Sequence, residues 1–213
     1  QAGNEIGLGP ISLKEIISHL EETYCNSIST EYMYIREPNR VQWIRKNIEL
    51  DKRKKFDATE RLQILKKISQ ATLFEEFLQK KFIGQKRFSL EGGESLIPAL
   101  DTLIEHGTNN GVKEVVIGMA HRGRLSTLAH ILGKSYRDIF SEFQGKDFEG
   151  DDNLEGDVKY HLGHSFTRKT DSDKEVSITL APNPSHLESV DPVVLGISRA
   201  RIDERGGEDN EVL

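Results

Sequence analysis

The sequence predicts an α/β protein, with an N-terminal layer of helices followed by part of a parallel-sheet domain. Two observations carry this prediction. Apolar residues recur at helical spacing through the N-terminal part of the chain, and further along two short β-branched runs, residues 112–119 and 176–180, are each followed by turn residues and another helical pattern. We therefore expect a helical segment over residues 1–82 and an α/β domain over residues 83–213, truncated at its C-terminal side.

The composition narrows the class of protein. With 36% hydrophobic and 30% charged residues, the chain belongs among globular proteins, and its net charge of −6 disfavours nucleic-acid binding, which needs a basic face. Cys25 is the only cysteine, so no internal disulfide can form. There is no long apolar run and no signal segment. We expect no contact with a membrane and a cytoplasmic location, or the mitochondrial matrix in a eukaryote.

The first helices are predicted from capping signals. Residues 12–15 (SLKE) form a capping box, and apolar residues at helical spacing follow it. Pro38 suits the entry of a second helix that runs to about Leu50. A second capping box at residues 57–60 starts a third helix, followed by a further helix or by a continuation after a bend at residues 69–70. We expect these helices to serve packing.

The second half of the chain alternates helices and strands. Glycines and turn residues separate the segments. The expected helices cover residues 95–107, 125–132, 139–143 and 192–205, the expected strands cover residues 112–119 and 176–180, and a further strand begins at residues 212–213.

The first strand leads into a corner that carries charged side chains. Gly118, His121, Arg122 and Arg124 follow the β-branched run, just before a helix. Anions bind at such corners, because the helix start offers unpaired N–H groups and its positive dipole end. The two arginines would add donors for a phosphate or a carboxylate. The alternative is an exposed helix start whose arginines pair with nearby carboxylates.

Two later segments carry similar side chains. His161 and Ser165 lie in one of them, and Ser185 and His186 follow the second strand, after two prolines that bracket Asn183. We expect these segments to meet the His121 corner at one edge of the sheet. A zinc site is disfavoured because no helical histidine pair is present. A Ser–His nucleophile is disfavoured because adjacent residues of an extended segment point in opposite directions.

Four blocks of the sequence together resemble a known family. They are residues 86–92 (KRFSLEG), 118–125 (GMAHRGRL), 156–163 (GDVKYHLG) and 181–188 (APNPSHLE). In order and spacing they resemble the thiamine-diphosphate-dependent decarboxylating first component of the 2-oxoglutarate dehydrogenase complex. The resemblance implies a transketolase-like fold, with the cofactor held between two domains at a homodimer interface.

The resemblance also implies roles for individual residues. His121 and His161 would act in catalysis by orienting the carboxylate and oxo groups of the substrate, and Ser165 would add a substrate contact. Arg122, Ser185 and Leu187 would line the thiamine diphosphate site, with Arg122 and Ser185 toward the diphosphate. In the family, a Gly-Asp-Ala-Ala segment followed by an Asn-Asn segment binds the metal and the diphosphate, and these segments would begin just after Leu213. We therefore expect the magnesium ligands to lie outside this chain, and the chain alone to be inactive.

The implied activity is oxidative decarboxylation of 2-oxoglutarate, with transfer of the succinyl group to the lipoyl arm of a partner acyltransferase. A 2-oxoadipate dehydrogenase and a non-oxidative 2-oxoglutarate decarboxylase stay open, because one methylene of substrate length discriminates weakly. A different class is also open, in which the chain is an interaction module that recognises an anionic group without catalysis.

Overall fold

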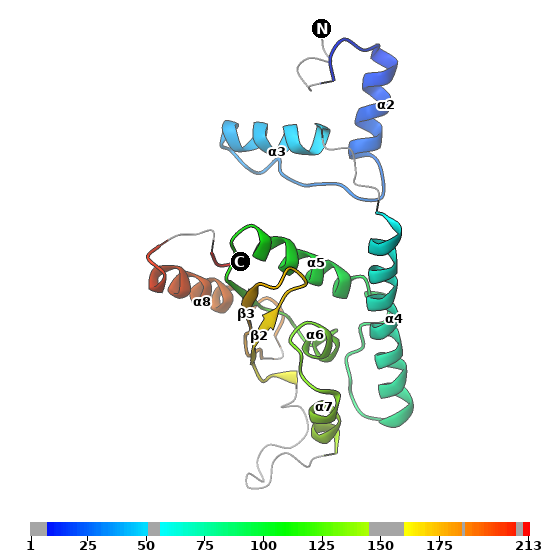
Figure 1. Ribbon diagram of the computed structural model, residues 1–213, viewed down its shortest axis with the longest axis vertical. Helices are drawn as coiled ribbons and strands as arrows, with labels where there is room; N and C mark the ends of the chain where they lie inside the picture. Colours follow the sequence, from blue (N-terminus) through cyan, green and yellow to red (C-terminus); the bar gives the residue numbers. More distant parts are fainter. Residues whose placement is uncertain (1–7, 51–55, 145–159, 185, 208–210) are drawn as a thin grey trace. The chain divides into compact units, whose positions relative to one another are not determined.

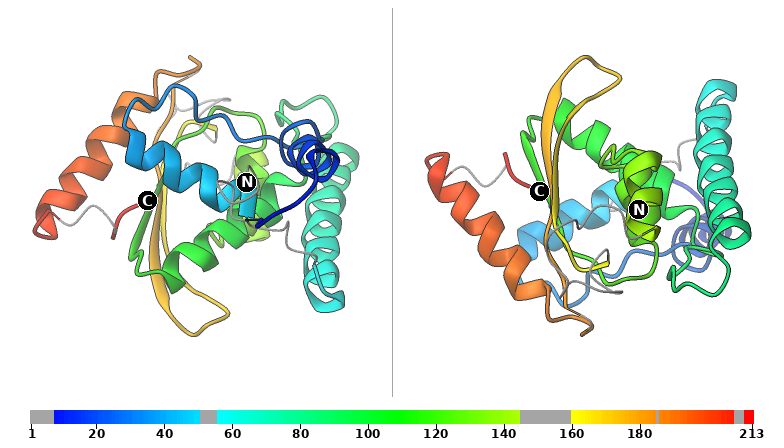
Figure 2. Two further views of the ribbon diagram at one scale, coloured as in Figure 1. Left: turned by 90° about the horizontal axis from the view of Figure 1, so that it is seen from above. Right: turned by 90° about the horizontal axis from the view of Figure 1, so that it is seen from below.

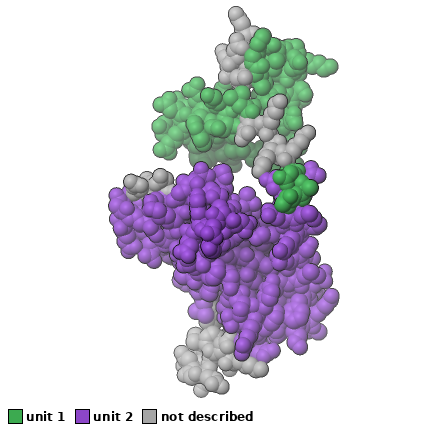
Figure 3. Space-filling view, in the orientation of Figure 1, with its two compact units in different colours: residues 1–59 green, residues 60–213 purple. Residues whose placement is uncertain are grey.

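The computed structural model describes residues 8–50, 56–144, 160–184, 186–207 and 211–213 (Figure 1). The chain divides into two compact units, residues 1–59 and residues 60–213 (Figure 3). Within the described residues, no helix is long and apolar enough to cross a membrane.

The first unit contains two amphipathic helices, α2 (Leu13–Tyr24) and α3 (Pro38–Leu50), and both confirm the expected positions. The capping box is present, since Ser12 accepts from the backbone of Glu15 and the Glu15 carboxylate accepts from the backbone of Ser12. Tyr24 connects α2 to α3, because its hydroxyl donates to Glu49 at 2.7 Å. The same hydroxyl lies 3.0 Å from the hydroxyl of Tyr32. Burial and these two partners raise the pKa of Tyr24.

Helix α4 (Ala58–Lys81) begins near the boundary of the units and continues without a break through residues 69–70, so the expected bend is absent. Its buried residues Phe74 and Leu78 join the hydrophobic core of the second unit. The boundary between the compact units therefore falls in the first turn of α4. The expected division at residue 82, which would group α4 with the earlier helices, stays a prediction about domains.

The second unit contains a three-stranded sheet in the order β1-β3-β2. Strand β1 (Glu114–Ile117) pairs in parallel with β3 (Glu175–Leu180), as expected, and Val212 forms a parallel bridge to Glu114. Strand β2 (His164–Lys169) pairs antiparallel with β3 and was not predicted. Its sequence, HSFTRK, lacks alternating apolar residues because most of its side chains are exposed. The sheet is therefore mixed rather than purely parallel.

Helices cover both faces of this sheet (Figure 2). Helix α8 (Asp191–Glu204) lies on one face, and α5 (Leu96–Asn109) and α6 (Arg124–His130) lie on the other, with α7 (Tyr136–Phe143) next to α6. The packing of α8 is close at Gly118, where a Cβ atom would lie 2.4 Å from Val194. The centre of the core consists of Leu78, Ile97, Ile104, Leu125, Leu128, Ile131, Leu132, Ile139, Ile178 and Leu180.

His130, at the end of α6, is a packing residue. Its ring meets Phe74 of α4 edge-on at a centroid distance of 5.4 Å, and its Nε2 lies 3.2 Å from the hydroxyl of Tyr136. Nδ1 lies 2.9 Å from the carbonyl oxygen of Ser126. Burial lowers the pKa of His130, and the charge of Lys67 lowers it further, against the opposing effect of the Ser126 hydrogen bond.

This shift predicts an acid-sensitive contact between α4 and α6. Because the folded pKa is below the ordinary value of 6.5, the unfolded chain takes up the proton first, and stability is lost as the pH falls below that value. We expect the free energy of unfolding to fall less steeply from pH 7 to pH 5 in His130→Gln than in the wild type. Urea unfolding at a series of pH values measures this slope. An unchanged slope in His130→Gln would contradict the prediction. His164→Gln removes another histidine whose pKa burial lowers, so its slope can be compared with that of His130→Gln.

Candidate active site

The two histidines that the sequence singles out lie side by side. The rings of His121 and His161 stack with their centroids 4.9 Å apart and their planes inclined by 24°. Phe88 lies against the ring of His121 at 4.8 Å, and the buried ring of Tyr160 meets Phe88 edge-on at 4.9 Å. Each histidine is half-buried. Aromatic rings therefore hold the two imidazoles in place, and each histidine as a whole is partly exposed.

His161 reaches this place because β2 is antiparallel. His164, the first residue of β2, pairs with Leu180, the last residue of β3. The segment before β2 thus starts from the same sheet edge at which the parallel strands β1 and β3 end. The backbone N–H of Asn183 donates to the carbonyl oxygen of His161 at 3.0 Å, which joins the segment after β3 to this pair.

A buried arginine holds the three segments together. The side chain of Arg124 is fully buried, and its guanidinium donates to the carbonyl oxygens of Met119 at 3.1 Å, Leu162 at 2.9 Å and Ala181 at 2.7 Å. Burial lowers the pKa of Arg124 to about 10, so the group stays protonated at neutral pH. The expectation that Arg124 donates to an anionic ligand is wrong, because the side chain is fully buried and its Nη1 and Nη2 donate to the protein's own backbone.

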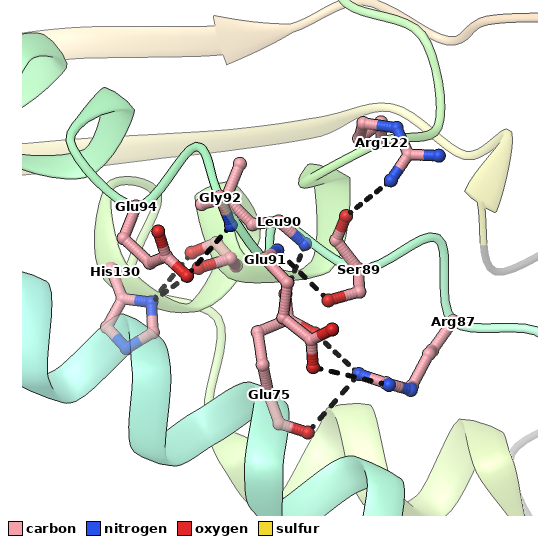
Figure 4. A network of polar contacts seen from close by, with 10 residues as sticks. Glu75, Arg87, Ser89, Leu90, Glu91, Gly92, Glu94, Arg122 and His130 are labelled. Atoms are coloured by element: carbon pink, nitrogen blue, oxygen red, sulfur yellow. Dashed lines mark hydrogen bonds and ion pairs between the residues drawn. The ribbon is translucent and has the colours of Figure 1, made fainter.

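Arg122, two residues earlier, is exposed and donates through Nη1 to the carbonyl oxygen of Ser89 at 3.0 Å (Figure 4). The buried carboxylate of Glu75 on α4 anchors the Ser89 loop. It accepts from the backbone N–H of Leu90 at 3.0 Å and from Arg87 at 3.2 Å (Figure 4). Burial raises the pKa of Glu75, against these hydrogen bonds and the charge of Arg87. One nitrogen of Arg122 is thus fixed by the backbone, while the exposed side chain keeps donors for a ligand.

Only glycine fits between Arg122 and Arg124. Gly123 has φ +75°, and a Cβ atom there would lie 2.5 Å from the side chain of Leu90. Its backbone N–H donates to the carbonyl oxygen of Phe88 at 2.9 Å. The expected close approach at Gly123 therefore exists, and the approaching group is the Phe88–Leu90 loop of the protein.

The remaining predicted site residues are Ser165, Leu187 and Ser185. Ser165 lies on β2, with its hydroxyl 3.4 Å from that of Thr179, and makes no described contact with the two histidines. Leu187 is 75% exposed on the segment after β3. Ser185 lies outside the described residues. The roles of all three stay predictions, as do the roles of His121, His161 and Arg122.

The structure adds residues that sequence reasoning did not select. Phe88 and Tyr160 lie within the blocks that carry the family resemblance, but only the fold shows that they contact the histidines. The sequence marks Asn183 only by its flanking prolines. Its side chain is 3% exposed, and neither of its polar atoms has a hydrogen-bond partner in the part of the chain that the structure describes. Within the described residues, no group of three or more His, Cys, Asp or Glu is placed to bind a metal ion.

Comparison with known proteins gives the family. Residues 66–208, most of the chain, match the family model described as "Dehydrogenase E1 component". The chain belongs to this family. Within it, the chain is 46% identical to the mitochondrial 2-oxoglutarate dehydrogenase of Saccharomyces cerevisiae over 194 residues, which is 91% of this chain and 19% of the yeast protein.

Bacterial members are equally similar. The chain is 47% identical over 202 residues to the 2-oxoglutarate dehydrogenase E1 components of Brucella ovis and Brucella canis, and these residues are 94% of this chain and 20% of each relative. The chain thus spans about a fifth of the length of these relatives.

The hydrogen bonds of Arg124 predict that its substitution lowers the stability of the fold strongly. Arg124→Met removes the shared donor of three carbonyl oxygens, of which that of Ala181 is buried and those of Met119 and Leu162 are partly buried, so we expect a loss of about 3–5 kcal/mol in the free energy of unfolding, and about 2 kcal/mol for Arg124→Lys, which keeps the charge. Chemical denaturation monitored by circular dichroism measures both. The matched control is Arg122→Met, which we expect to change stability by less than about 1 kcal/mol because the side chain is exposed. Equal effects at the two arginines would contradict the structural role of Arg124.

Proposed function

We propose that this chain forms part of a thiamine-diphosphate-dependent enzyme that decarboxylates 2-oxoglutarate oxidatively and passes the succinyl group to the lipoyl arm of an acyltransferase. The observation that carries the proposal is the stacked pair of His121 and His161 at a sheet edge, on an anion-binding corner. The relatives named 2-oxoglutarate dehydrogenase support the substrate.

The two imidazoles suit a 2-oxo acid. Such a substrate presents a carboxylate and an adjacent carbonyl oxygen, which both accept hydrogen bonds, and each imidazole can donate one. Because the rings are stacked 4.9 Å apart, they can reach neighbouring oxygens of one small molecule. The rings of Phe88 and Tyr160 exclude water behind them, which strengthens such polar contacts. In this proposal His121 and His161 orient the substrate, and Ser165 contacts it from β2.

The residues at this corner also fit thiamine diphosphate. The diphosphate is an anion that takes charge-assisted donors, and Arg122 offers an exposed guanidinium on a rigid loop. Arg122 and Ser185 would hold the diphosphate, and the exposed side chain of Leu187 would pack on the organic part. When bound, the cofactor supplies the electron sink for decarboxylation. We assign no magnesium ligand to the described residues and propose that the metal is bound by other parts of the enzyme.

The partners and compartment follow from the same proposal. We propose a homodimer that serves a lipoyl-bearing succinyltransferase, in the mitochondrial matrix of a eukaryote or the cytoplasm of a bacterium. Among the alternatives, a 2-oxoadipate dehydrogenase would show the higher kcat/KM with 2-oxoadipate. A non-oxidative decarboxylase would release an aldehyde without an electron acceptor. Membership of an enzyme family disfavours an interaction module without catalysis.

The histidine pair predicts a specific loss of activity. In the protein expressed from its full-length gene, we expect His121→Ala and His161→Ala each to lower kcat/KM for 2-oxoglutarate roughly 100-fold, because each removes an oriented hydrogen bond to the reacting groups. Reduction of ferricyanide that depends on 2-oxoglutarate measures the rate. The matched control is His106→Ala, which changes an exposed histidine on α5 and should leave the rate unchanged. Full activity in both site variants would contradict the assignment.

Arg122 predicts a change in cofactor affinity. We expect Arg122→Ala to raise the Kd for thiamine diphosphate roughly tenfold or more in the full-length protein, because a charge-assisted contact to the diphosphate is lost. Arg122→Lys keeps the charge and should bind more tightly than Arg122→Ala. Isothermal titration calorimetry in the presence of magnesium measures both affinities. A Kd equal to that of the wild type in Arg122→Ala would place the diphosphate elsewhere.

A further inference from the structure

Among the residues that the structure describes, the side-chain amide of Asn183 has no hydrogen-bond partner. Asn183 is 3% exposed, and both Nδ2 and Oδ1 are shielded from solvent without an acceptor or a donor within reach. A buried polar group in this state costs about as much free energy as a lost hydrogen bond, and native proteins rarely retain one without a use. The arrangement therefore calls for a partner from outside the chain.

The position of Asn183 indicates what that partner is. Its backbone N–H is bound to the carbonyl oxygen of His161, whose ring stacks on His121. Pro182 and Pro184 fix the backbone on both sides, and Ala181 just before them is held by Arg124. The amide thus belongs to a rigid segment whose backbone is bound to His161, one of the histidine pair. Because water does not reach it, only a group that contacts it directly can satisfy it.

We propose that Asn183 is a ligand-binding residue of this site, and that its Nδ2 donates to an anionic oxygen of the molecule held beside His121 and His161. The inference rests on the proposed function and extends it to a residue with no assigned role. Two sources supply the required oxygen, the carboxylate of the 2-oxo acid and the diphosphate of the cofactor. Oδ1 then accepts from an N–H or O–H group of the bound ligand.

A structural role and a ligand role make opposite predictions for one substitution. Leucine has nearly the shape of asparagine but no polar atoms. If the amide stabilised the fold, Asn183→Leu would lower the melting temperature of the ligand-free protein. An amide without partners does not stabilise the fold, so we expect a melting temperature that is unchanged or raised. The substitution should weaken only the binding of ligand.

The test uses the protein from its full-length gene and measures three quantities: the melting temperature without ligand, the Kd for thiamine diphosphate with magnesium by calorimetry, and KM and kcat for 2-oxoglutarate. We expect Asn183→Leu to keep the melting temperature and to raise one binding constant roughly tenfold. A raised KM with an unchanged Kd identifies the substrate carboxylate as the partner. A raised Kd identifies the diphosphate. Asn183→Asp, which places a negative charge against the anion, should raise the same constant further.

The control is Thr127→Val. Thr127 is also fully buried with an unpartnered side-chain oxygen, but it lies within α6, and its substitution should leave both binding constants unchanged. The proposal is overturned if Asn183→Leu leaves Kd and KM unchanged, or if Asn183→Leu and Asn183→Ser both fail to fold. A wild-type protein that neither binds thiamine diphosphate nor decarboxylates 2-oxoglutarate would instead refute the proposed function.

Discussion

The arrangement of the site depends on one buried guanidinium. Arg124 binds the carbonyl oxygens of three segments that are remote in sequence: the turn after β1, the turn before β2 and the residues after β3. A planar guanidinium with several N–H donors can donate to three carbonyl groups at once. No other side chain does this as well. The segments that carry His121, His161 and Asn183 are therefore fixed to one another through their backbones.

The mixed sheet also helps to bring the segments of the site together. In a purely parallel sheet, a strand's C-terminal end is the only end that reaches the ligand-binding edge. Because β2 runs antiparallel to β3, the residues that precede β2 reach this edge as well. His161 is brought to His121 by this reversal. Glu75 supports the opposite side of the corner, since it holds the loop that meets Arg122 and contains Phe88.

Local signals predicted the helices well and the site only in part. The capping box at residues 12–15 and the helical stripe after Pro38 depend on near neighbours alone, so the sequence shows them directly. Strand β2 has one apolar side chain, and only its pairing with β3 makes it a strand. Arg122 and Arg124 are chemically identical and two residues apart. Which of them is buried depends on Leu162 and Ala181, contacts that no local pattern contains.

The buried arginine also bears on the choice of ligand. Within the described residues, the guanidinium of Arg124 is bound by carbonyl oxygens and by no carboxylate, so its charge is not cancelled by an opposite charge. A buried charge is weakly screened, and its potential extends to the nearby edge of the sheet. The chain as a whole carries a net charge of −6, and Arg122 and Arg124 place two positive charges at this corner. In the proposed function, a dianionic 2-oxo acid and a diphosphate are the kinds of ligand that these positive charges attract, and an anionic oxygen of either would satisfy the amide of Asn183.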